Sequence, residues 1–293
     1  MKEPLLSIVI ANYNYGRFLP NAIESVVSQG MGDKVELIIC DGGSTDNSCE
    51  VIKRYADKIA WWCSEKDDGQ SAAFNKGFYR ARGRFLCWLN ADDIILPGVL
   101  EKFEQATLRY SECEWFGGGC IQMDPDMRVF KCDRARAISQ IRAKYGLVHV
   151  TGPSSFFSRK LYCSVGKIDE RFHYTMDIDL WAKFALLARA KYIPFIPYAW
   201  GLRLHPNAKM SGHKFSDGGK ILEGRASREA YRRDTKRFKQ LELEYKWKHE
   251  ALGLPERSMP RLLRYMSASY GAVFMSRIDT WRWRGKLVAS LKF

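Results

Sequence analysis

RFLCWLNADDIILPG, residues 84–98, is the stretch that decides the fold class, because an apolar run ends in two adjacent acids and then turns apolar again. The apolar run predicts a buried strand that ends near Asn90. Two neighbouring carboxylates repel each other, and a carboxylate beside a core is costly unless it is paired or bound to a cation. Asp92 and Asp93 therefore predict a positive partner at the end of this strand.

Three further apolar runs precede this one, and each is followed by a stretch with the spacing of an amphipathic helix. These runs are LLSIVIA (5–11), VELIIC (35–40) and IAWWCS (59–64). The four runs end in the polar stretches ANYN, DGGSTD, SEKDDGQ and NADD. This order predicts an α/β fold, with a Rossmann-like, mostly parallel central sheet flanked by helices and a ligand beyond the carboxyl ends of the strands.

The pattern becomes less regular from about Glu112. CEWFGGGCIQM and SSFFSRK predict further strands, DIDLWAKFALLARA predicts a helix, and KYIPFIPYAW predicts an edge strand because its prolines cannot donate to a sheet. After LRLHPNAKMS the sequence changes to basic helical stretches. We therefore predict a main domain over residues 1–210 and a basic helical extension over residues 211–293.

The composition is that of a globular protein, with 46% hydrophobic and 27% charged residues among 293. Eight cysteines form no C-x-x-C pair, which favours reduced, buried thiols. No basic leader and no apolar run of about 18 residues is present, so we expect a cytoplasmic protein without a membrane span. The net charge of +14 is uneven: residues 203–293 carry 21 Lys and Arg against 9 Asp and Glu, and residues 1–202 carry 26 against 24.

Six blocks in this order resemble the inverting family 2 glycosyltransferases with the A-type nucleotide-binding fold, over about residues 5–210. The blocks are SIVIANYNYGRFL, DGGSTDNS, EKDDGQSAAFNKGF, LNADD, MDIDLW and LRLHPNAKMS. The resemblance is strongest to members that build bacterial surface polysaccharides. It implies a catalytic domain that binds a nucleotide-sugar, with a UDP-sugar as the first choice of donor.

The resemblance implies a set of residues around the nucleotide-sugar. They are Ala11, Asn12, Tyr13, Asp41, Asp68, Gln70, Asn90, Ala91 and Asp92. The residues alone allow other roles: Asp41 can stabilise the turn DGGSTD, and Asp46 can cap the next helix. Asn75 and Lys76 on the following helix fit a packing or surface role equally well.

A divalent cation, Mn²⁺ or Mg²⁺, is the cofactor that the resemblance implies, because hard cations bind both carboxylates and phosphates. The family's metal motif is D-x-D, and Asn90 stands at its first position here. Asp92 then carries more of the metal binding, with His205 as a second ligand or as a structural side chain. Alternation along the strand end would place Asn90 and Asp92 on one side, and Asp93 would cap the helix that begins near Pro97.

Asp177 matches the family's catalytic carboxylate, which is commonly preceded by another acid where this chain has Met176. A carboxylate near apolar and aromatic side chains becomes more basic, which favours removal of a proton from a sugar hydroxyl. Asp179, two residues later, should start or cap the helix that contains Trp181.

The basic extension mixes Lys and Arg with aromatic residues, as in RIDTWRWRGKLVASLKF. Such a surface suits a nucleic acid, an anionic membrane or simple packing on the main domain. We favour an anionic membrane surface and no nucleic acid, because polysaccharide acceptors are often lipid-linked glycans at the inner face of the cell membrane. The expected protein is thus a peripheral, metal-dependent inverting glycosyltransferase that acts on a glycan or lipid-linked glycan.

Two other classes of protein fit the sequence less well. A dinucleotide-binding oxidoreductase would need a G-x-G-x-x-G turn after the first strand, where this chain has ANYNYG. A non-catalytic basic adaptor for membranes or nucleic acid would explain the extension but not the acids at the strand ends.

Overall fold

The computed structural model describes residues 3–135, 152–187, 192–205, 207–209, 213–215 and 221–223. The chain divides into two compact units, Met1–Asp234 and Thr235–Phe293. The predicted basic extension therefore lies outside the described residues, apart from two short strands. None of the helices in the described ranges is long and apolar enough to cross a membrane.

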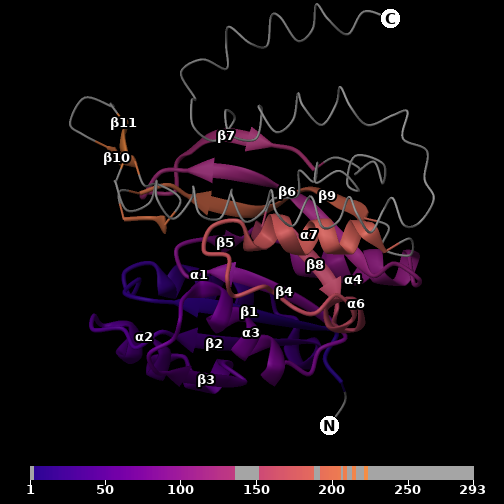
Figure 1. Ribbon diagram of the computed structural model, residues 1–293, viewed down its shortest axis with the longest axis horizontal. Coiled ribbons are helices and arrows are strands. Elements are labelled where there is room, and N and C mark those ends of the chain that lie inside the picture. Colours follow the sequence, from indigo (N-terminus) through magenta and orange to yellow (C-terminus); the bar gives the residue numbers. More distant parts are fainter. Residues whose placement is uncertain are drawn as a thin grey trace, which may run out of the picture. The chain divides into compact units, whose positions relative to one another are not determined.

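The first four strands form the parallel half of the sheet. They are β1 (Leu6–Asn12), β2 (Val35–Asp41), β3 (Trp61–Ser64) and β4 (Phe85–Asn90). Their order is β3-β2-β1-β4, as Figure 1 shows, and every pairing among them is parallel. The strand-to-helix units predicted from the sequence are confirmed.

Helices α1 (Leu19–Val27), α2 (Ser48–Arg54) and α3 (Gln70–Arg80) connect these strands, α4 (Val99–Arg109) follows the fourth strand, and each buries one face in the core. Two 3₁₀ turns lie at Gly32–Lys34 and Ala56–Lys58. The approach of α3 to β1 is close, because a Cβ at Gly77 would lie 2.3 Å from Cγ1 of Val9. Glycine is therefore required at this position for the helix to sit on the sheet.

The second half of the sheet is mixed. It contains β5 (Ile94–Ile95), β6 (Trp115–Met123), β7 (Val129–Asp133), β8 (Ser155–Ser158) and β9 (Tyr192–Arg203). The order continues β4-β8-β6-β9-β5, with β8 antiparallel to both neighbours, β9 parallel to β6, and β7 antiparallel to β6. The predicted α/β class is confirmed, and the parallel arrangement gives way to a mixed one after β4.

Several shorter elements complete the described structure. They are the 3₁₀ turn Gly152–Ser154, helices α6 (Arg159–Ser164) and α7 (Met176–Leu186), and the antiparallel pair β10 (His213–Phe215) and β11 (Ile221–Glu223). Helix α7 packs on the sheet through stacked indole rings. The ring centroids of Trp181 in α7 and Trp88 in β4 are 5.1 Å apart, with an interplanar angle of 4°. This stack fixes the helix that carries Asp177.

The prediction that residues 191–200 form an edge strand holds for most of that stretch and fails at its end. Strand β9 lies between β6 and β5 in the strand order, but β5 pairs with it only at Trp200 and Gly201. The exposed Pro194 and Pro197 precede this pairing, where β6 is the one strand that pairs with β9 among the described residues. The prolines thus lie in the part of β9 that has a strand on one side only, where a missing N–H donor is tolerated.

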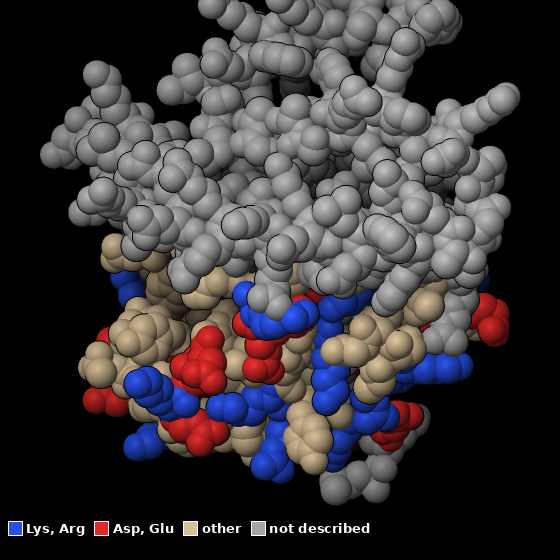
Figure 2. All heavy atoms as spheres, in the orientation of Figure 1, with Lys and Arg blue, Asp and Glu red and all other residues tan. Residues whose placement is uncertain are grey.

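Acidic and basic side chains lie next to one another on the described surface in Figure 2, without a large area of one sign. This agrees with the small net charge of residues 1–202, in which 26 basic residues balance 24 acidic ones. The excess positive charge belongs to the residues after 202.

Candidate functional site

The carboxyl ends of the parallel strands bring several predicted site residues together. Ala11 at the end of β1 pairs in register with Asn90 of β4, and Asn12 pairs with Asp41 of β2. Asp41 in turn pairs with Ser64 of β3. Parallel pairing places these ends at one edge of the sheet, where ligands bind in such folds.

Asp41 is buried and accepts hydrogen bonds from four side chains. Nδ2 of Asn12 lies 2.6 Å from Oδ1, and Oγ of Ser64 lies 2.6 Å from Oδ2. Ser44 donates through both its hydroxyl and its backbone N–H, and Sγ of Cys49 lies 3.9 Å from Oδ2. Burial alone would raise the pKa of Asp41, but the hydrogen bonds from Ser44, Ser64 and Asn12 outweigh it and hold the pKa below its ordinary value. These contacts show that Asp41 stabilises the turn, and its contact with a nucleotide stays a prediction.

The other predicted nucleotide residues differ in exposure. Tyr13 is 60% exposed beyond the end of β1, and Asp68 is exposed in the loop before α3. Within the described ranges Asp68 forms no hydrogen bond or ion pair. The methyl group of Ala91 is buried in the core, so any ligand contact of this residue would come from its backbone.

The residues from Asn90 to Asp93 form a tight turn. The backbone N–H of Asp93 donates to the carbonyl of Asn90 at 3.1 Å, and Nδ2 of Asn90 donates to Oδ2 of Asp93 at 2.7 Å. Nε2 of Gln70, the first residue of α3, donates to Oδ1 of Asn90 at 2.8 Å. The side chain of Asn90 is thus engaged with Gln70 and Asp93.

The prediction that Asp93 caps the following helix is wrong. Helix α4 begins at Val99, and its N-cap is Gly98, whose φ of 75° suits glycine. Asp93 is instead buried and accepts the backbone N–H of Arg203 at 2.9 Å. Burial and the neighbouring charge of Asp92 raise the pKa of Asp93 above its ordinary value.

Asp92 and His205 form a buried pair. Nε2 of His205 lies 3.1 Å from Oδ2 of Asp92, and both side chains are almost inaccessible. The imidazole packs on Phe18, with ring centroids 4.5 Å apart, and meets the ring of Tyr15 edge-on at 5.5 Å. His205 therefore has the packed surroundings of a structural residue and also faces the acid predicted to bind metal.

These two groups fit a divalent cation only in part. In the described part of the chain, no group of three or more His, Cys, Asp and Glu side chains could hold a metal ion. A cation at Asp92 and His205 would therefore need further ligands from a phosphate or from water, which is how Mg²⁺ is usually bound beside a phosphorylated substrate. The donor set suits a metal that binds together with its ligand.

Residues 203–205 and 207–209 lie beside the strand ends, and the side chains or backbone of positions 203, 205, 207 and 209 contact the site. Besides the contacts of Arg203 and His205, the carbonyl of Asn207 accepts the hydroxyl of Tyr15 at 2.8 Å, and Nζ of Lys209 donates to Oε1 of Gln70 at 2.9 Å. Sequence reasoning missed Tyr15 and Lys209. Both lie inside the quoted blocks, and the alternation of LRLHPNAK was the available signal.

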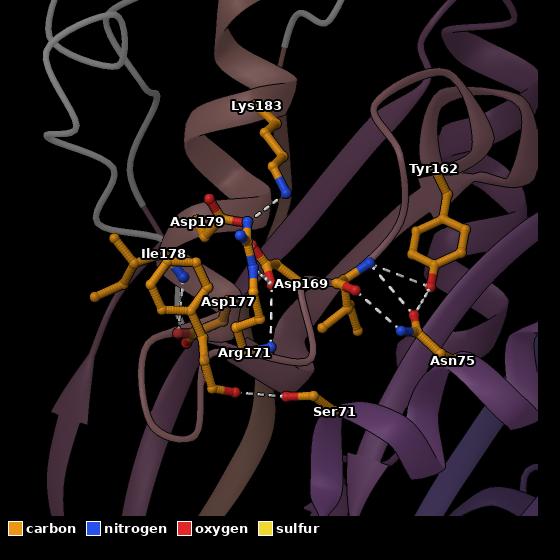
Figure 3. Close-up of polar contacts among 11 residues, drawn as sticks. Ser71, Asn75, Tyr162, Asp169, Arg171, Asp177, Ile178, Asp179 and Lys183 are labelled. Carbon is orange, nitrogen blue, oxygen red and sulfur yellow. Dashed lines mark hydrogen bonds and ion pairs between the residues drawn. The ribbon is translucent and has the colours of Figure 1, made fainter. Parts of the chain in front are cut away.

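Asp177 lies at the beginning of α7 and is half-buried (Figure 3). Its Oδ1 accepts the backbone N–H of Ile178 at 2.8 Å, and a Cβ at Gly152 would lie 3.4 Å from its Oδ2. Burial raises the pKa of Asp177 to about 6, and the nearby positive charge of Lys209 limits this rise. The carboxylate therefore has the basicity predicted from its apolar neighbours.

The prediction that Asp179 starts or caps α7 is wrong. The N-cap is Thr175, and Asp179 is the fourth residue of the helix. Asp179 is buried and forms an ion pair with Lys183 one turn later, at 2.6 Å, as Figure 3 shows. The negative charge of Asp179 is therefore paired within α7.

The loop before α7 is fastened to α3. Oγ of Ser71 donates to the carbonyl of Phe172 at 2.8 Å, and Nδ2 of Asn75 donates to the carbonyl of Ile168 at 2.9 Å. The hydroxyl of Tyr162 donates to Oδ1 of Asn75 (Figure 3). These contacts assign the packing role to Asn75, and Lys76 pairs with Glu65 at 3.0 Å on the surface.

Fold and site together are those of an α/β protein with polar side chains at the carboxyl ends of its parallel strands, the position at which ligands bind in this class of fold. The sequence pattern described as glycosyl transferase family 2 matches residues 7–162, more than half of the chain. The chain belongs to glycosyl transferase family 2.

Relatives found by sequence agree with this membership. An uncharacterized glycosyltransferase of Rickettsia typhi is 29% identical over 193 residues, which cover 62% of this chain and 59% of the relative. One from Nostoc sp. is 43% identical over 101 residues, which cover 33% of this chain and 31% of the relative. The chain thus spans less than two thirds of the length of these relatives.

The crystal structure of S. aureus TarS, residues 1–349, matches with a TM-score of 0.55 at 16% identity. The match covers 68% of this chain and 60% of that chain. At this identity the likeness shows the fold alone.

We predict that Asp41→Asn lowers the free energy of unfolding by about 1–3 kcal/mol, because an amide cannot accept all the hydrogen bonds that the carboxylate accepts. The low pKa of Asp41 stabilises the folded state at neutral pH, and this contribution is lost as the pH falls through the folded-state value. The variant should therefore lose less stability than the wild type on acidification. Urea unfolding at several pH values measures both effects.

Asp68→Asn is the matched control, since Asp68 is exposed and has no partner among the described residues. It should change the unfolding free energy by no more than about 0.5 kcal/mol. Equal effects of the two substitutions would show that the contacts of Asp41 do not stabilise the strand ends.

Proposed function

We propose that the protein is an inverting glycosyltransferase that transfers a sugar from a nucleoside diphosphate sugar to a hydroxyl of a glycan or lipid-linked glycan. The observation that supports it most is the position of Asp177, whose pKa is raised to about 6. Lys209 lies near this acid and donates to Gln70, which donates to Asn90 at the strand end. A basic carboxylate beside a predicted donor site is the arrangement that this transfer needs.

Asp177 would act as the general base. As the acceptor oxygen attacks the anomeric carbon from the side opposite the diphosphate, the carboxylate takes the proton of the hydroxyl and the nucleoside diphosphate leaves. One displacement of this kind inverts the configuration at the anomeric carbon. A carboxylate with a pKa near 6 is still largely ionised at neutral pH and is a stronger base than an ordinary aspartate.

Asp92 and His205 would hold a divalent cation, Mn²⁺ or Mg²⁺, together with the diphosphate of the donor. Such a cation, when bound, offsets the negative charge that develops on the leaving diphosphate. The carboxylate of Asp92 and the imidazole of His205 are its candidate protein ligands because they already meet at 3.1 Å.

The nucleoside would lie between the loop after β1 and the loop after β2. Asn12 and Ser44 meet the buried Asp41, which holds this loop pair in place, and the exposed ring of Tyr13 is available to a base. A UDP-sugar is the first donor to test. S. aureus TarS, which has the same fold, has been solved in complex with UDP and with UDP-GlcNAc.

We place the acceptor in cell-surface polysaccharide synthesis, and the basic extension on an anionic membrane that would present it. The extension carries most of the net charge of +14 and interleaves it with tryptophan, as in TWRWRGK. A non-catalytic basic adaptor is the second candidate. It would use the same extension but would give no role to the basicity of Asp177, so turnover of a nucleotide-sugar separates the two.

We predict that Mn²⁺ strengthens UDP binding by the wild-type protein but has little effect on Asp92→Asn. Loss of a direct ligand should weaken metal-dependent binding by about a hundredfold or more, since even neighbours of metal ligands change affinity 10–100-fold. Calorimetry with UDP, with and without Mn²⁺, measures this difference. Asp33→Asn, at an exposed position, is the control for the change in charge. Unchanged coupling between UDP and Mn²⁺ in Asp92→Asn would remove Asp92 from the metal site.

We predict that turnover falls as the pH drops through about 6, because Asp177 must be ionised to accept the proton. Asp177→Asn should lower kcat by roughly 10²–10⁴-fold and abolish this acidic limb, with little change in UDP affinity. A pH profile of kcat with UDP-sugar and a glycan acceptor tests both points, with the exposed Asp57→Asn as control. Loss of UDP binding in Asp177→Asn would assign the residue to the donor site instead.

We predict that the full chain binds vesicles containing anionic lipid and that binding weakens with salt, because the screening length falls to about 3 Å at 1 M. Truncation after Pro255 should weaken vesicle binding and leave UDP binding intact, since the proposed donor residues all precede Lys209. Co-sedimentation with vesicles measures this. Equal pelleting of both forms would argue against a membrane role for the extension.

A further inference from the structure

A continuous series of hydrogen bonds crosses the strand-end edge of the site. Nζ of Lys209 donates to Oε1 of Gln70 at 2.9 Å, and Nε2 of Gln70 donates to Oδ1 of Asn90 at 2.8 Å. Nδ2 of Asn90 donates to Oδ2 of Asp93 at 2.7 Å, and the backbone N–H of Arg203 donates to Oδ1 of Asp93 at 2.9 Å. Three side chains, at positions 70, 90 and 93, thus join the donors of Arg203 and Lys209.

The two ends of this series fix its polarity. The ammonium of Lys209 and the backbone N–H of Arg203 can only donate. The side-chain amides of Gln70 and Asn90 each accept one hydrogen bond and donate the next. All hydrogen bonds from Lys209 to Asp93 therefore run in the same donor-to-acceptor direction. A series with a donor at both ends therefore needs one member that accepts on both sides. Asp93 is that member, because both of its oxygens accept here.

The series also fixes the direction of Asp92. Asn90 and Asp93 close their turn twice, by the backbone hydrogen bond of 3.1 Å and by the side-chain hydrogen bond of 2.7 Å. Asp92 lies between them in the chain and points at His205, at 3.1 Å. If the turn lost its side-chain bond, Asp92 would lose the constraint that aims it.

We propose that Asn90 is a positioning residue for Asp92, and that it must be an amide because residue 93 is the acid. An acid at position 90, which the family pattern would place there, would face the carboxyl group of Asp93, and no donor would lie between them while both acids are ionised. Such an acid would become acceptable once residue 93 is an amide. The inference rests on the proposed function for its effect on the donor site, but the hydrogen-bond series itself does not.

The test is an exchange of the acid and the amide. Asn90→Asp places two carboxyl groups face to face, and Asp93→Asn leaves two hydrogen-bond donors face to face. In the double variant position 90 is the one acid, and every acceptor of the series again has a donor. Each single variant should lower the urea midpoint and weaken UDP binding with Mn²⁺ at pH 8 by about tenfold or more. The double variant should recover most of both losses.

Asn47→Asp is the matched control for the change from amide to acid, because Asn47 is the exposed N-cap of α2 and forms no capping bond through its side chain. It should leave the urea midpoint close to that of the wild type.

Position 70 supplies a second test in case Asn90→Asp does not fold. Gln70 is half-buried, and Gln70→Glu moves an acceptor to that end of the series. The single variant should lose stability and UDP affinity, and Gln70→Glu with Asp93→Asn should recover them, since Asn90 can then reverse its amide. Both double variants therefore test the rule that one acid, and only one, stands among positions 70, 90 and 93.

Additive losses in either double variant would overturn the inference, because a polarity-matched series requires coupling between the positions. If the wild type binds no UDP, the proposed donor is wrong, and the unfolding measurements alone decide whether the series exists. If the urea midpoints recover in the double variants but UDP binding does not, the series is structural and Asn90 does not position Asp92.

Discussion

The parallel pairing of β1 with its two neighbours, β2 and β4, is the constraint on which the site depends. Parallel strands end at the same edge, so Asn12, Asp41 and Asn90 meet although they come from separate parts of the chain. The buried aliphatic side chains of β1 and the helices above them hold this pairing in the core. Each polar strand end is then a fixed position on a rigid sheet, which suits a binding site better than a free loop does.

Four acids lie in the site region, and their surroundings give them different chemistry. Asp41 accepts several hydrogen bonds, which lower its pKa, keep the carboxylate ionised and stabilise the turn after β2. Asp93 is buried among donors and next to Asp92, so it serves the turn. Asp92 faces an imidazole. Burial raises the pKa of Asp177 to about 6 although the backbone N–H of Ile178 donates to it, so it is the acid best suited to the proposed proton transfer.

Residues 203–205 and 207–209 join these parts. They lie at and after the end of β9, and their contacts reach both the turn at Asp93 and the first residue of α3. Lys209 also lies over the ring of Tyr174, at 5.4 Å, just before α7. The residues proposed to bind the donor and to act on the acceptor are therefore held in one network, and the proposed transfer requires both substrates in line.

The sequence by itself determined the strands and helices of the first half, the edge at which polar residues gather, and the family. These follow from apolar periodicity and from ordered blocks, which are local properties of the chain. Only the tertiary structure decided that β5 pairs with the end of β9, that Asp93 and Asp179 do not cap helices, and that Asn90 faces Asp93 and Gln70. The bond of Asp93 to Arg203 spans 110 positions and that of Gln70 to Lys209 spans 139. Such partners depend on how the sheet brings distant segments together, so no local pattern specifies them.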